Sequence, residues 1–410
     1  MTTVAEKASV WERELLLTGC QAVSHAVKLA DVDVIAAYPI RPYTEVMDQL
    51  SQLIADGELD AEYIIADSEH SQFEIVKHAS SVGARAFGGS SGTGWMYGME
   101  ALVVTATDRL PPLFLVGNRA LDDPGAFGVE HNDAMSVRDM GWLICWASTA
   151  QEALEHVFIG YRIAEDKRVR MPMALAMDGG FLTHAQHMVK VPTSEAVNQF
   201  LPPYDLGERV LHPDNPISVA PQVNEDWVME LRRQNWEAAR RARKVIKEAY
   251  QEFNAIFGSH GSEYGNPYFS EFMTEDAEAV LIGIGAVCMP TRTAARRLRE
   301  KGHKVGYVNL RWFRPFPTEE LRACLGRVKG LGVIDRDFSH GSPDDGGILM
   351  QDVRSCLYPL RDRPNEINFM GGLGGRDISI DECITMYERT LEAGRGDVPA
   401  EIVSWTGLRE

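Results

Sequence analysis

Residues 32–42 read VDVIAAYPIRP, an apolar run that ends in a turn with two prolines. The stretch from Val32 to Ala37 predicts a buried β-strand, because its residues are mostly apolar and either branched or small. Pro39 and Pro42 keep the following residues out of a helix, so we expect a rigid turn at the carboxyl end of this strand. Residues 44–55 then show helical spacing, which completes a strand–turn–helix unit.

The same strand–loop–helix rhythm continues along the first half of the chain. Such an alternation predicts a parallel sheet with helices on both faces, and therefore the α/β class. The expected strands are 63–66, 84–88, 112–116 and 169–177, the last of the sheet, and the expected helices are 71–82 and 95–107.

Beyond this unit, the pattern changes twice. Proline-rich residues 200–222 predict an extended linker, and residues 224–257 predict a long polar helix. A second α/β unit then begins near Asp276. We expect its strands at 279–284, 304–309, 332–335 and 365–370, its helices at 290–301, 318–325 and up to 360, and a turn at 311–317. The predicted parts are a parallel-sheet domain (1–199), a linker with a long helix (200–275) and a second α/β domain (276–410).

Charge and hydropathy exclude several classes of protein. The chain has 410 residues and a formal net charge of -18, and such an acidic field repels phosphate backbones, so we expect no nucleic-acid partner. The best apolar run, 279–289, is far shorter than the ~20 residues of a membrane span. The first eleven residues lack the hydrophobic core of a signal peptide. These features predict a cytoplasmic protein without a membrane span.

Cofactor motifs are incomplete. The six cysteines form no CxxC pair, so we expect neither zinc nor an iron–sulfur cluster in this chain, and no metal ligand is predicted. Residues 283–285 (GIG) suggest a dinucleotide fingerprint, but Cys288 stands where the third glycine belongs. Residues 178–180 (DGG) are the nearest match to the GDG signature of thiamine diphosphate sites, and no suitably spaced asparagine pair follows. The sequence alone therefore indicates no diphosphate site.

Three charged residues follow expected strands, where α/β sheets bind ligands. Glu69 starts a helix and is either a surface cap or a site residue. Arg41, between two prolines, is either a solvated turn residue or a ligand-binding cation. Arg119 lies in a loop with Asp122 and flanking glycines, so it either pairs with an acid of that loop or faces a ligand.

The motifs become informative as an ordered set. That set is 38–42 (YPIRP), 68–70 (SEH), 83–92 (GARAFGGSSG), Arg119, 311–317 (RWFRPFP) and 371–375 (GGLGG). It resembles the alpha subunit of 2-oxoacid:acceptor oxidoreductases, the pyruvate:ferredoxin oxidoreductase superfamily, over nearly the whole chain. The resemblance implies that 1–199 is the pyrimidine-binding half of a thiamine diphosphate site and that 276–410 is a transketolase-C-terminal-like domain.

The resemblance also implies roles for individual residues. Glu69 matches the family glutamate that hydrogen-bonds the aminopyrimidine and activates the cofactor. We expect Pro39 and Ile40 to contact the same cofactor. Arg119 matches the arginine that binds the substrate carboxylate. Its loop is expected to move and to bring Asp122 to the site once CO₂ has left.

Arg41 departs from the family pattern. Pyruvate enzymes of the family usually read Tyr-Pro-Ile-Thr-Pro, so a cation here replaces a hydroxyl. The substitution makes oxalate oxidoreductase the member most resembled, since a dianion needs two cations. Phenylglyoxylate dehydrogenase is the alternative, because Trp95, Met96 and Tyr97 could line an aryl pocket. The sequence leaves both substrates open.

The resemblance implies partner subunits. A beta subunit with a pyrophosphate-binding domain would supply Mg²⁺ and the diphosphate contacts. A gamma-type subunit and a ferredoxin-like subunit are also expected, with iron–sulfur clusters on partner subunits only and with ferredoxin or NAD as the acceptor. An NAD-linked flavoprotein is a further candidate. The competing hypothesis is a non-catalytic transketolase-like scaffold.

Overall fold

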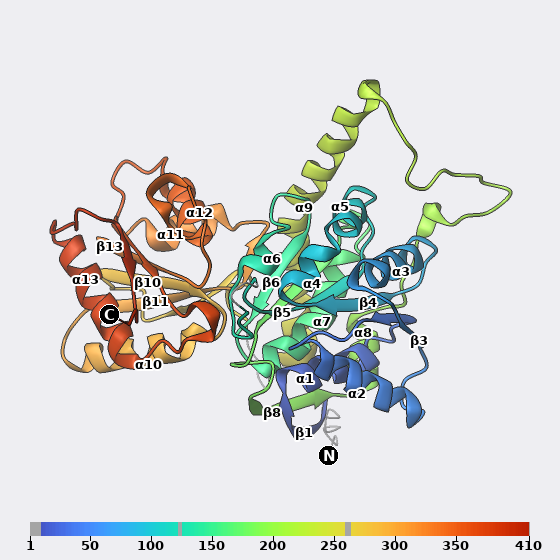
Figure 1. Ribbon diagram of the computed structural model, residues 1–410, viewed down its shortest axis with the longest axis horizontal. Helices are drawn as coiled ribbons and strands as arrows, with labels where there is room; N and C mark the ends of the chain where they lie inside the picture. Colours follow the sequence, from blue (N-terminus) through green and yellow to red (C-terminus); the bar gives the residue numbers. More distant parts are fainter. Residues whose placement is uncertain (1–9, 122–124, 259–263, 410) are drawn as a thin grey trace, which may run out of the picture.

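The computed structural model describes residues 10–121, 125–258 and 264–409, which form two α/β domains lying side by side (Figure 1). The N-terminal domain contains a seven-stranded sheet with the order β12-β6-β7-β5-β4-β2-β3. All neighbouring strands run parallel except β12, which confirms the predicted parallel sheet. Its strands include β2 (Val34–Ala37), β3 (Glu62–Ile65), β4 (Ala86–Ser90), β5 (Leu113–Asn118), β6 (Leu143–Ala147) and β7 (Met173–Asp178).

Helices cover both faces of this sheet. α3, α4 and α5 pack together on one face, whereas α1 packs against α2 and α7 on the other. The crossovers through α2 and α3 run in opposite directions along the sheet, so right-handed connections place these helices on opposite faces. The helices are α1 (Gly19–Leu29), α2 (Thr44–Ala55), α3 (Glu69–Ser81), α4 (Gly92–Tyr97), α5 (Met99–Thr107), α6 (Asn132–Met135), α7 (Ala150–Ala164) and α8 (Ser194–Phe200).

Several details differ from the sequence-based expectation, which did not include β6, α1, α6, α7 or α8. The single helix predicted over 95–107 is two helices, which meet at Gly98, where the backbone passes against the ring of Phe73 too closely for a Cβ atom. A separate antiparallel pair, β1 (Trp11–Thr18) and β8 (Gln186–Pro192), was absent from the predicted elements.

The C-terminal domain is a second α/β domain, as predicted. Its six-stranded sheet has the order β15-β14-β13-β10-β11-β9, in which only β9 is antiparallel. α10 packs against α13 and α11 packs against α12. The elements are β9 (Phe269–Phe272), β10 (Ala279–Ile284), α10 (Cys288–Glu300), β11 (Val305–Leu310), α11 (Thr318–Leu325), β13 (Gly330–Asp335), α12 (Ile348–Leu357), β14 (Asn365–Met370), α13 (Ile380–Gly394) and β15 (Val403–Trp405).

The segment 311–317 is not the simple turn that its sequence predicts. Trp312–Arg314 form β12, which pairs antiparallel with β6, so the N-terminal sheet extends past β7, the strand expected to be its last. Trp312 and Phe313 are fully buried there. The Trp312 indole also donates a hydrogen bond to the Tyr250 hydroxyl (2.9 Å). Because two aromatic side chains bury a large apolar surface, they hold this strand on the neighbouring domain.

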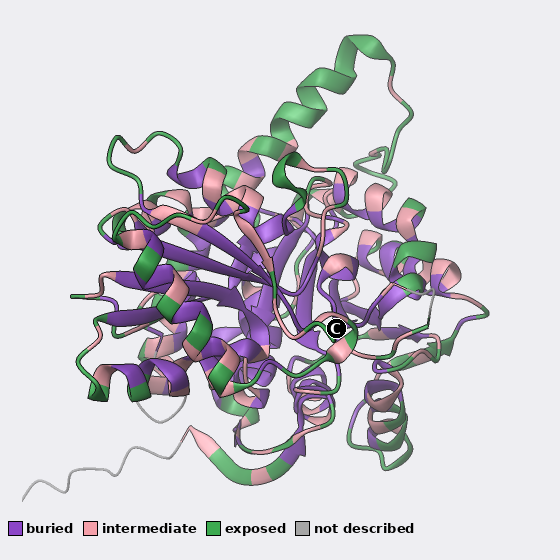
Figure 2. Cartoon of the chain, turned by 60° about the vertical axis from the view of Figure 1, so that its left-hand side comes forward, coloured by how far each residue is buried: buried purple, intermediate pink, exposed green. Residues whose placement is uncertain are grey.

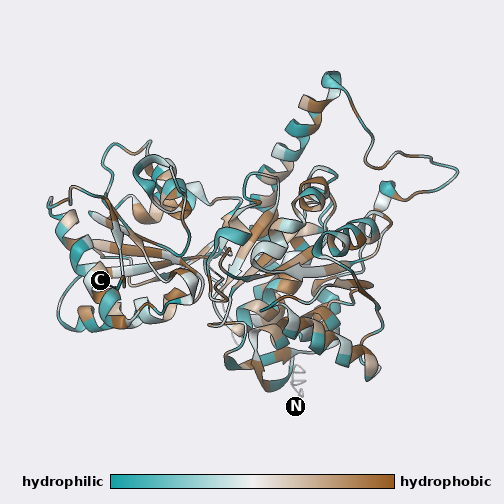
Figure 3. Ribbon diagram, in the orientation of Figure 1, coloured by the Kyte–Doolittle hydropathy of each residue, from teal (hydrophilic) through white to brown (hydrophobic). Residues whose placement is uncertain are grey.

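The long helix predicted over 224–257 is confirmed as α9 (Glu225–Phe257), about 50 Å long at 1.5 Å per residue. Its C-terminal half is buried and packs on α7, whereas its first turns project from the domain and are exposed (Figure 2). Hydrophobic and hydrophilic residues alternate along the projecting turns (Figure 3). None of the helices within the described residues combines the length and apolar composition that a membrane span requires.

A buried ion pair also joins the two parts of the chain. The Arg311 guanidinium, just before β12, donates to Oε1 of Glu152 on α7 (3.0 Å) and lies over the Tyr264 ring. Burial alone would raise the pKa of Glu152, but Arg311, together with His156 and hydrogen bonds from Ser148, lowers it to about 2. The carboxylate therefore stays charged in the interior because its partners hold it there.

We expect Glu152→Gln to lower the free energy of unfolding by about 3–5 kcal/mol, because Arg311 would be left as a buried charge without its carboxylate. Chemical denaturation checks this, with Glu100→Gln as a matched exposed control. The wild-type contribution should be present above the ordinary glutamate pKa and fall away as pH drops toward 2. A variant as stable as the wild type would show that the pair does not hold the junction.

Candidate active site

The carboxyl ends of β2, β4, β5 and β7 lie at one edge of the N-terminal sheet, because these strands are parallel neighbours. Ligands of open α/β sheets bind outside this edge. The loops that leave it begin at Tyr38, Ser91 and Arg119. The structure therefore gathers there the segments that carry Arg41 and Arg119, as the sequence predicts.

Glu69 is directed into the protein by the start of α3. The Ser68 side chain accepts the N–H of Ser71 (3.2 Å), so Ser68 is the cap and Glu69 is not needed for that role. Glu69 is only 8% exposed, and its carboxylate makes no hydrogen bond with any residue that the structure describes. The alternative of an exposed surface cap is therefore wrong for Glu69.

Gly94 allows α4 to approach this carboxylate. A Cβ atom at Gly94 would collide with Oε1 of Glu69 and would lie 2.6 Å from Cδ1 of Ile40. The structure thus brings together Glu69 and Ile40, two predicted cofactor contacts, across a position where only glycine fits. The third predicted cofactor contact, Pro39, directly precedes Ile40 and is exposed. A buried acceptor next to an apolar side chain suits a flat heteroaromatic ring with an N–H donor.

Arg119 and Arg41 are neighbours at the same edge. The Arg119 guanidinium lies within 3.4 Å of the Arg41 carbonyl oxygen and stacks on the Phe127 ring at 4.7 Å. Arg119 is buried, whereas Arg41 is exposed. The aliphatic part of Arg119 passes 3.4 Å from where a Cβ of Gly92 would stand. This contact places the backbone of Arg41 beside the Arg119 guanidinium. Asp122, the fourth predicted site residue of this edge, lies outside the described residues.

Asp133 holds these loops together. Its fully buried carboxylate accepts the backbone N–H groups of Gly92 (2.9 Å) and Arg119 (3.0 Å) on Oδ2. Its other oxygen accepts the Asn118 amide (2.7 Å) and the N–H of Ala134 (2.7 Å). Burial raises the pKa of Asp133 to about 6, although the hydrogen bonds oppose the shift. Asp133 thus fixes both the first residue of α4 and the start of the loop that carries Arg119.

The DGG stretch has a structural role that its sequence did not predict. Asp178 is fully buried and contacts the His131 imidazole (2.9 Å), the Arg336 guanidinium (3.2 Å) and the N–H of Ala286 (2.9 Å). Burial pushes the pKa of Asp178 up, but His131 and Arg336 outweigh it and lower the pKa. Arg336 and Ala286 belong to the C-terminal domain, so this aspartate anchors one domain to the other. The GIG motif lies against the same carboxylate, since a Cβ at Gly285 would collide with it.

Trp95 does not face the site. It is fully buried, and its ring packs edge-on against Phe73, Phe114 and Trp142 at 5.4–5.9 Å. The expectation that Trp95 lines an aryl pocket is therefore wrong, because the indole is packed inside the hydrophobic core on the face of the sheet that α3 covers. Met96 and Tyr97 are more exposed.

The sequence reading missed Asp133 and His131. His131 lies in the loop before α6, and Asp133 lies in α6 itself. This four-residue helix has too few residues to give a periodic pattern. The only available signal was the polar run 130–133 (EHND) beside apolar residues. Asn118, which bridges Asp133 and the Trp146 indole, lies two residues beyond the strand predicted over 112–116 and was not singled out.

Comparisons with known proteins agree with this arrangement. Residues 25–251 match the family model described as pyruvate flavodoxin/ferredoxin oxidoreductase, thiamine diphosphate-binding, and residues 277–383 match pyruvate:ferredoxin oxidoreductase core domain II. A solved 2-oxoglutarate:ferredoxin oxidoreductase from Magnetococcus marinus has the same fold over 92% of this chain and 65% of that chain, with a TM-score of 0.69 and 16% identity. The two family models together identify an oxidoreductase subunit with a thiamine diphosphate-binding domain.

Curated relatives identify the family. The pyruvate synthase subunit PorA of Pyrococcus horikoshii is 36% identical over 95% of this chain and 97% of its own length. The ketoisovalerate oxidoreductase subunit VorA of Pyrococcus abyssi is 35% identical over 94% and 96%. The Thermotoga maritima PorA is 34% identical over the full length of both. The chain belongs to the pyruvate:ferredoxin oxidoreductase family of 2-oxoacid oxidoreductases.

We expect Asp133→Asn to raise the KM for a 2-oxoacid roughly tenfold, because an amide offers fewer acceptor sites to the N–H groups of Gly92 and Arg119. Wild-type activity should fall as pH drops through about 6, where Asp133 takes up a proton and loses an acceptor. The variant should lack this acidic limb. Steady-state kinetics between pH 5 and 8 measure both effects, with exposed Asp139→Asn as control. An unchanged pH profile in Asp133→Asn would refute the assignment.

Proposed function

We propose that this chain is the alpha subunit of a thiamine diphosphate-dependent oxidoreductase that oxidatively decarboxylates a 2-oxoacid. Electrons would pass through iron–sulfur clusters of partner subunits to ferredoxin or NAD. The observation that carries the proposal is the buried Glu69 carboxylate, which faces Gly94 and Ile40 with acceptor capacity to spare. When bound, the cofactor supplies the electron sink that decarboxylation of a 2-oxoacid requires.

In this proposal Glu69 is the catalytic residue and holds a proton at the aminopyrimidine. Its low exposure excludes competing water, so a hydrogen bond from the ring would be strong. Ile40 and the exposed Pro39 flank the ring, and Gly94 leaves the space that the ring needs. These residues fit the pyrimidine half of the cofactor. They contain no cation for its diphosphate.

Partner subunits would supply the metal ion, the diphosphate contacts and the clusters. No group of three or more metal-binding side chains is present among the described residues, and the six cysteines are buried apart from one another as free thiols. Following the family resemblance, we assign Mg²⁺ and the diphosphate contacts to a beta subunit, and the clusters to that subunit and a ferredoxin-like one. A gamma-type subunit and an NAD-linked flavoprotein complete the proposed partners. The relatives are themselves named as subunits.

For the substrate we favour a small dianion such as oxalate over phenylglyoxylate. The proposal rests on Arg41 and Arg119 lying in neighbouring loops at one edge, since two cations suit two carboxylates better than one. The burial of Trp95 removes one of the three side chains expected to line an aryl pocket. Under this proposal Arg119 binds the carboxylate next to the reacting carbon, and Arg41 binds the other. For phenylglyoxylate, Arg41 would face the oxo group instead.

We expect Glu69→Gln to lower kcat at least a hundredfold, since an amide cannot take up the ring proton, while the complex still assembles. Turnover with a dye acceptor and gel filtration measure the two outcomes. Glu100→Gln, an exposed glutamate on the neighbouring helix, is the matched control and should keep wild-type activity. Near-normal turnover in Glu69→Gln would favour the scaffold hypothesis.

Arg41→Thr should lower kcat/KM for oxalate roughly ten- to a hundredfold, because one charge-assisted hydrogen bond is lost. The variant should also turn over pyruvate better than the wild type. The neutral threonine hydroxyl can lie beside the methyl group of pyruvate at a lower cost than a charged guanidinium. A panel of 2-oxoacids measures both changes, with the exposed Arg297→Ala as control. Native kinetics in Arg41→Thr would mean that Arg41 is only a turn residue.

A further inference from the structure

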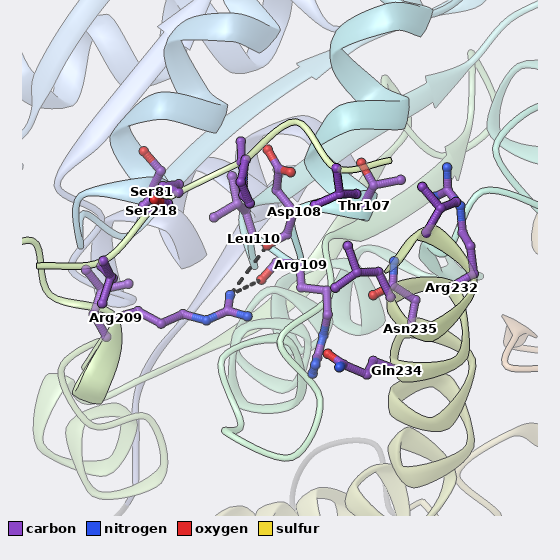
Figure 4. Close-up of a pocket in the computed structure, with 18 of the residues that line it drawn as sticks. Ser81, Thr107, Asp108, Arg109, Leu110, Arg209, Ser218, Arg232, Gln234 and Asn235 are labelled. Atoms are coloured by element: carbon purple, nitrogen blue, oxygen red, sulfur yellow. Dashed lines mark hydrogen bonds between the residues drawn. The ribbon is translucent and has the colours of Figure 1, made fainter. Parts of the chain in front are cut away.

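A cavity lies far from the candidate active site. It has a volume of about 340 Å³ and is enclosed by the end of α5, the linker and the exposed turns of α9 (Figure 4). α5 runs back from the carboxyl edge of the sheet to the start of β5, so its last residues lie at the opposite edge. The cavity is therefore separated from Glu69 by the length of the strands.

The charges that line this cavity are unusual for the chain. The charged lining residues are Arg109, Arg209, Arg232 and Asp108, which gives a local charge of +2 in a protein whose formal net charge is -18. Among the described residues, none of these three arginines forms an ion pair with an acid. Such a local excess of positive charge attracts and holds anions.

Hydrogen bonds fix two of the guanidinium groups but do not neutralise them. Arg209 Nη1 donates to the carbonyl oxygens of Arg109 (3.2 Å) and Asp108 (3.4 Å), as Figure 4 shows. Arg109 Nη2 donates to the carbonyl of Val169 (2.6 Å), and its Nε is buried without a hydrogen-bond partner among the described residues. Burial, with Arg209, Arg241 and Arg170 nearby, lowers the pKa of Arg109 to about 10. The cations thus repel one another, and a bound anion would relieve the repulsion.

The rest of the lining indicates the kind of ligand. Apolar side chains form one part of the wall, and neutral hydrogen-bonding groups form another. The apolar group includes Leu110, Leu206, Val219 and Leu231, and the polar group includes Ser81, Ser218, Gln234 and Asn235. A ligand that matches both would carry a compact anion on an apolar body. A dianion balances the +2 charge, and a guanidinium group can bind two phosphate oxygens at once.

We propose that this cavity is a binding site for a small phosphate monoester with an apolar body, distinct from the thiamine diphosphate site. Its ligand would contact α5, the linker and α9 together, and so would hold the linker and the projecting helix against the domain. A phosphate dianion is favoured over a monocarboxylate because it matches both the local charge and the number of guanidinium groups.

The test uses the purified complex with thiamine diphosphate in excess, so that the diphosphate site is filled. Isothermal titration calorimetry with phenyl phosphate, inorganic phosphate and benzoate separates the ester, the bare anion and the carboxylate. Arg109→Ala should weaken phenyl phosphate binding roughly ten- to a hundredfold. Arg232→Ala, an exposed residue whose loss leaves the fold intact, should weaken it several-fold, and less so at high salt. Arg233→Ala, adjacent but outside the cavity lining, should bind like the wild type.

Tighter binding of phenyl phosphate than of inorganic phosphate or benzoate, lost in step with the two lining arginines, would support the proposal. Binding unchanged in both Arg109→Ala and Arg232→Ala would overturn it, as would equal affinity for benzoate. Cross-linking of the cavity arginines to an acidic segment of a partner subunit would also overturn it, since the cavity would then be a protein interface. None of these results depends on catalytic activity, so the active-site proposal is tested separately.

Discussion

The arrangement of the two domains depends on the contacts of the buried Asp178 carboxylate with His131 and Arg336. A carboxylate without water is stable only when opposite charges and hydrogen bonds replace its hydration, and here His131 and Arg336 supply them from two different domains. Arg336 directly follows β13 of the C-terminal sheet, and His131 precedes α6, which carries Asp133. The same contact therefore sets the domain junction and supports the loops that bear Arg119 and Gly92.

Close backbone approach is the second constraint at this edge. Gly94, in the first turn of α4, admits the Glu69 carboxylate, where a Cβ atom would collide with Oε1, so this glycine determines how near the acid comes to α4. Gly128 and Gly375 meet in the same manner across the domain junction, where the N–H of Gly375 reaches the carbonyl of Val129 (3.2 Å). Small residues thus set the shape of the site, while a few charged residues provide its chemistry.

Local sequence patterns predicted most of the fold, because strands such as 279–284 are continuous apolar runs and helices such as 44–55 show helical spacing. They did not predict β12, since three residues next to a proline pair give no period and their burial depends on β6, distant in sequence. At the candidate site, position after a strand singled out Glu69, Arg41 and Arg119, while their proposed roles come from the family resemblance. The structural roles of Asp133 and Asp178 were not predicted, because they arise only from contacts between residues distant in sequence.

The pairing of β12 with β6 has a consequence for dissection of the chain. β6 is an entirely buried hydrophobic strand, and β12 covers the side that would otherwise present unpaired N–H and C=O groups to solvent. A fragment that stops after α9 would uncover this strand as a sheet edge, and such edges recruit strands from other molecules. The N-terminal domain is thus protected from aggregation by residues that the chain supplies only after most of it has been synthesised.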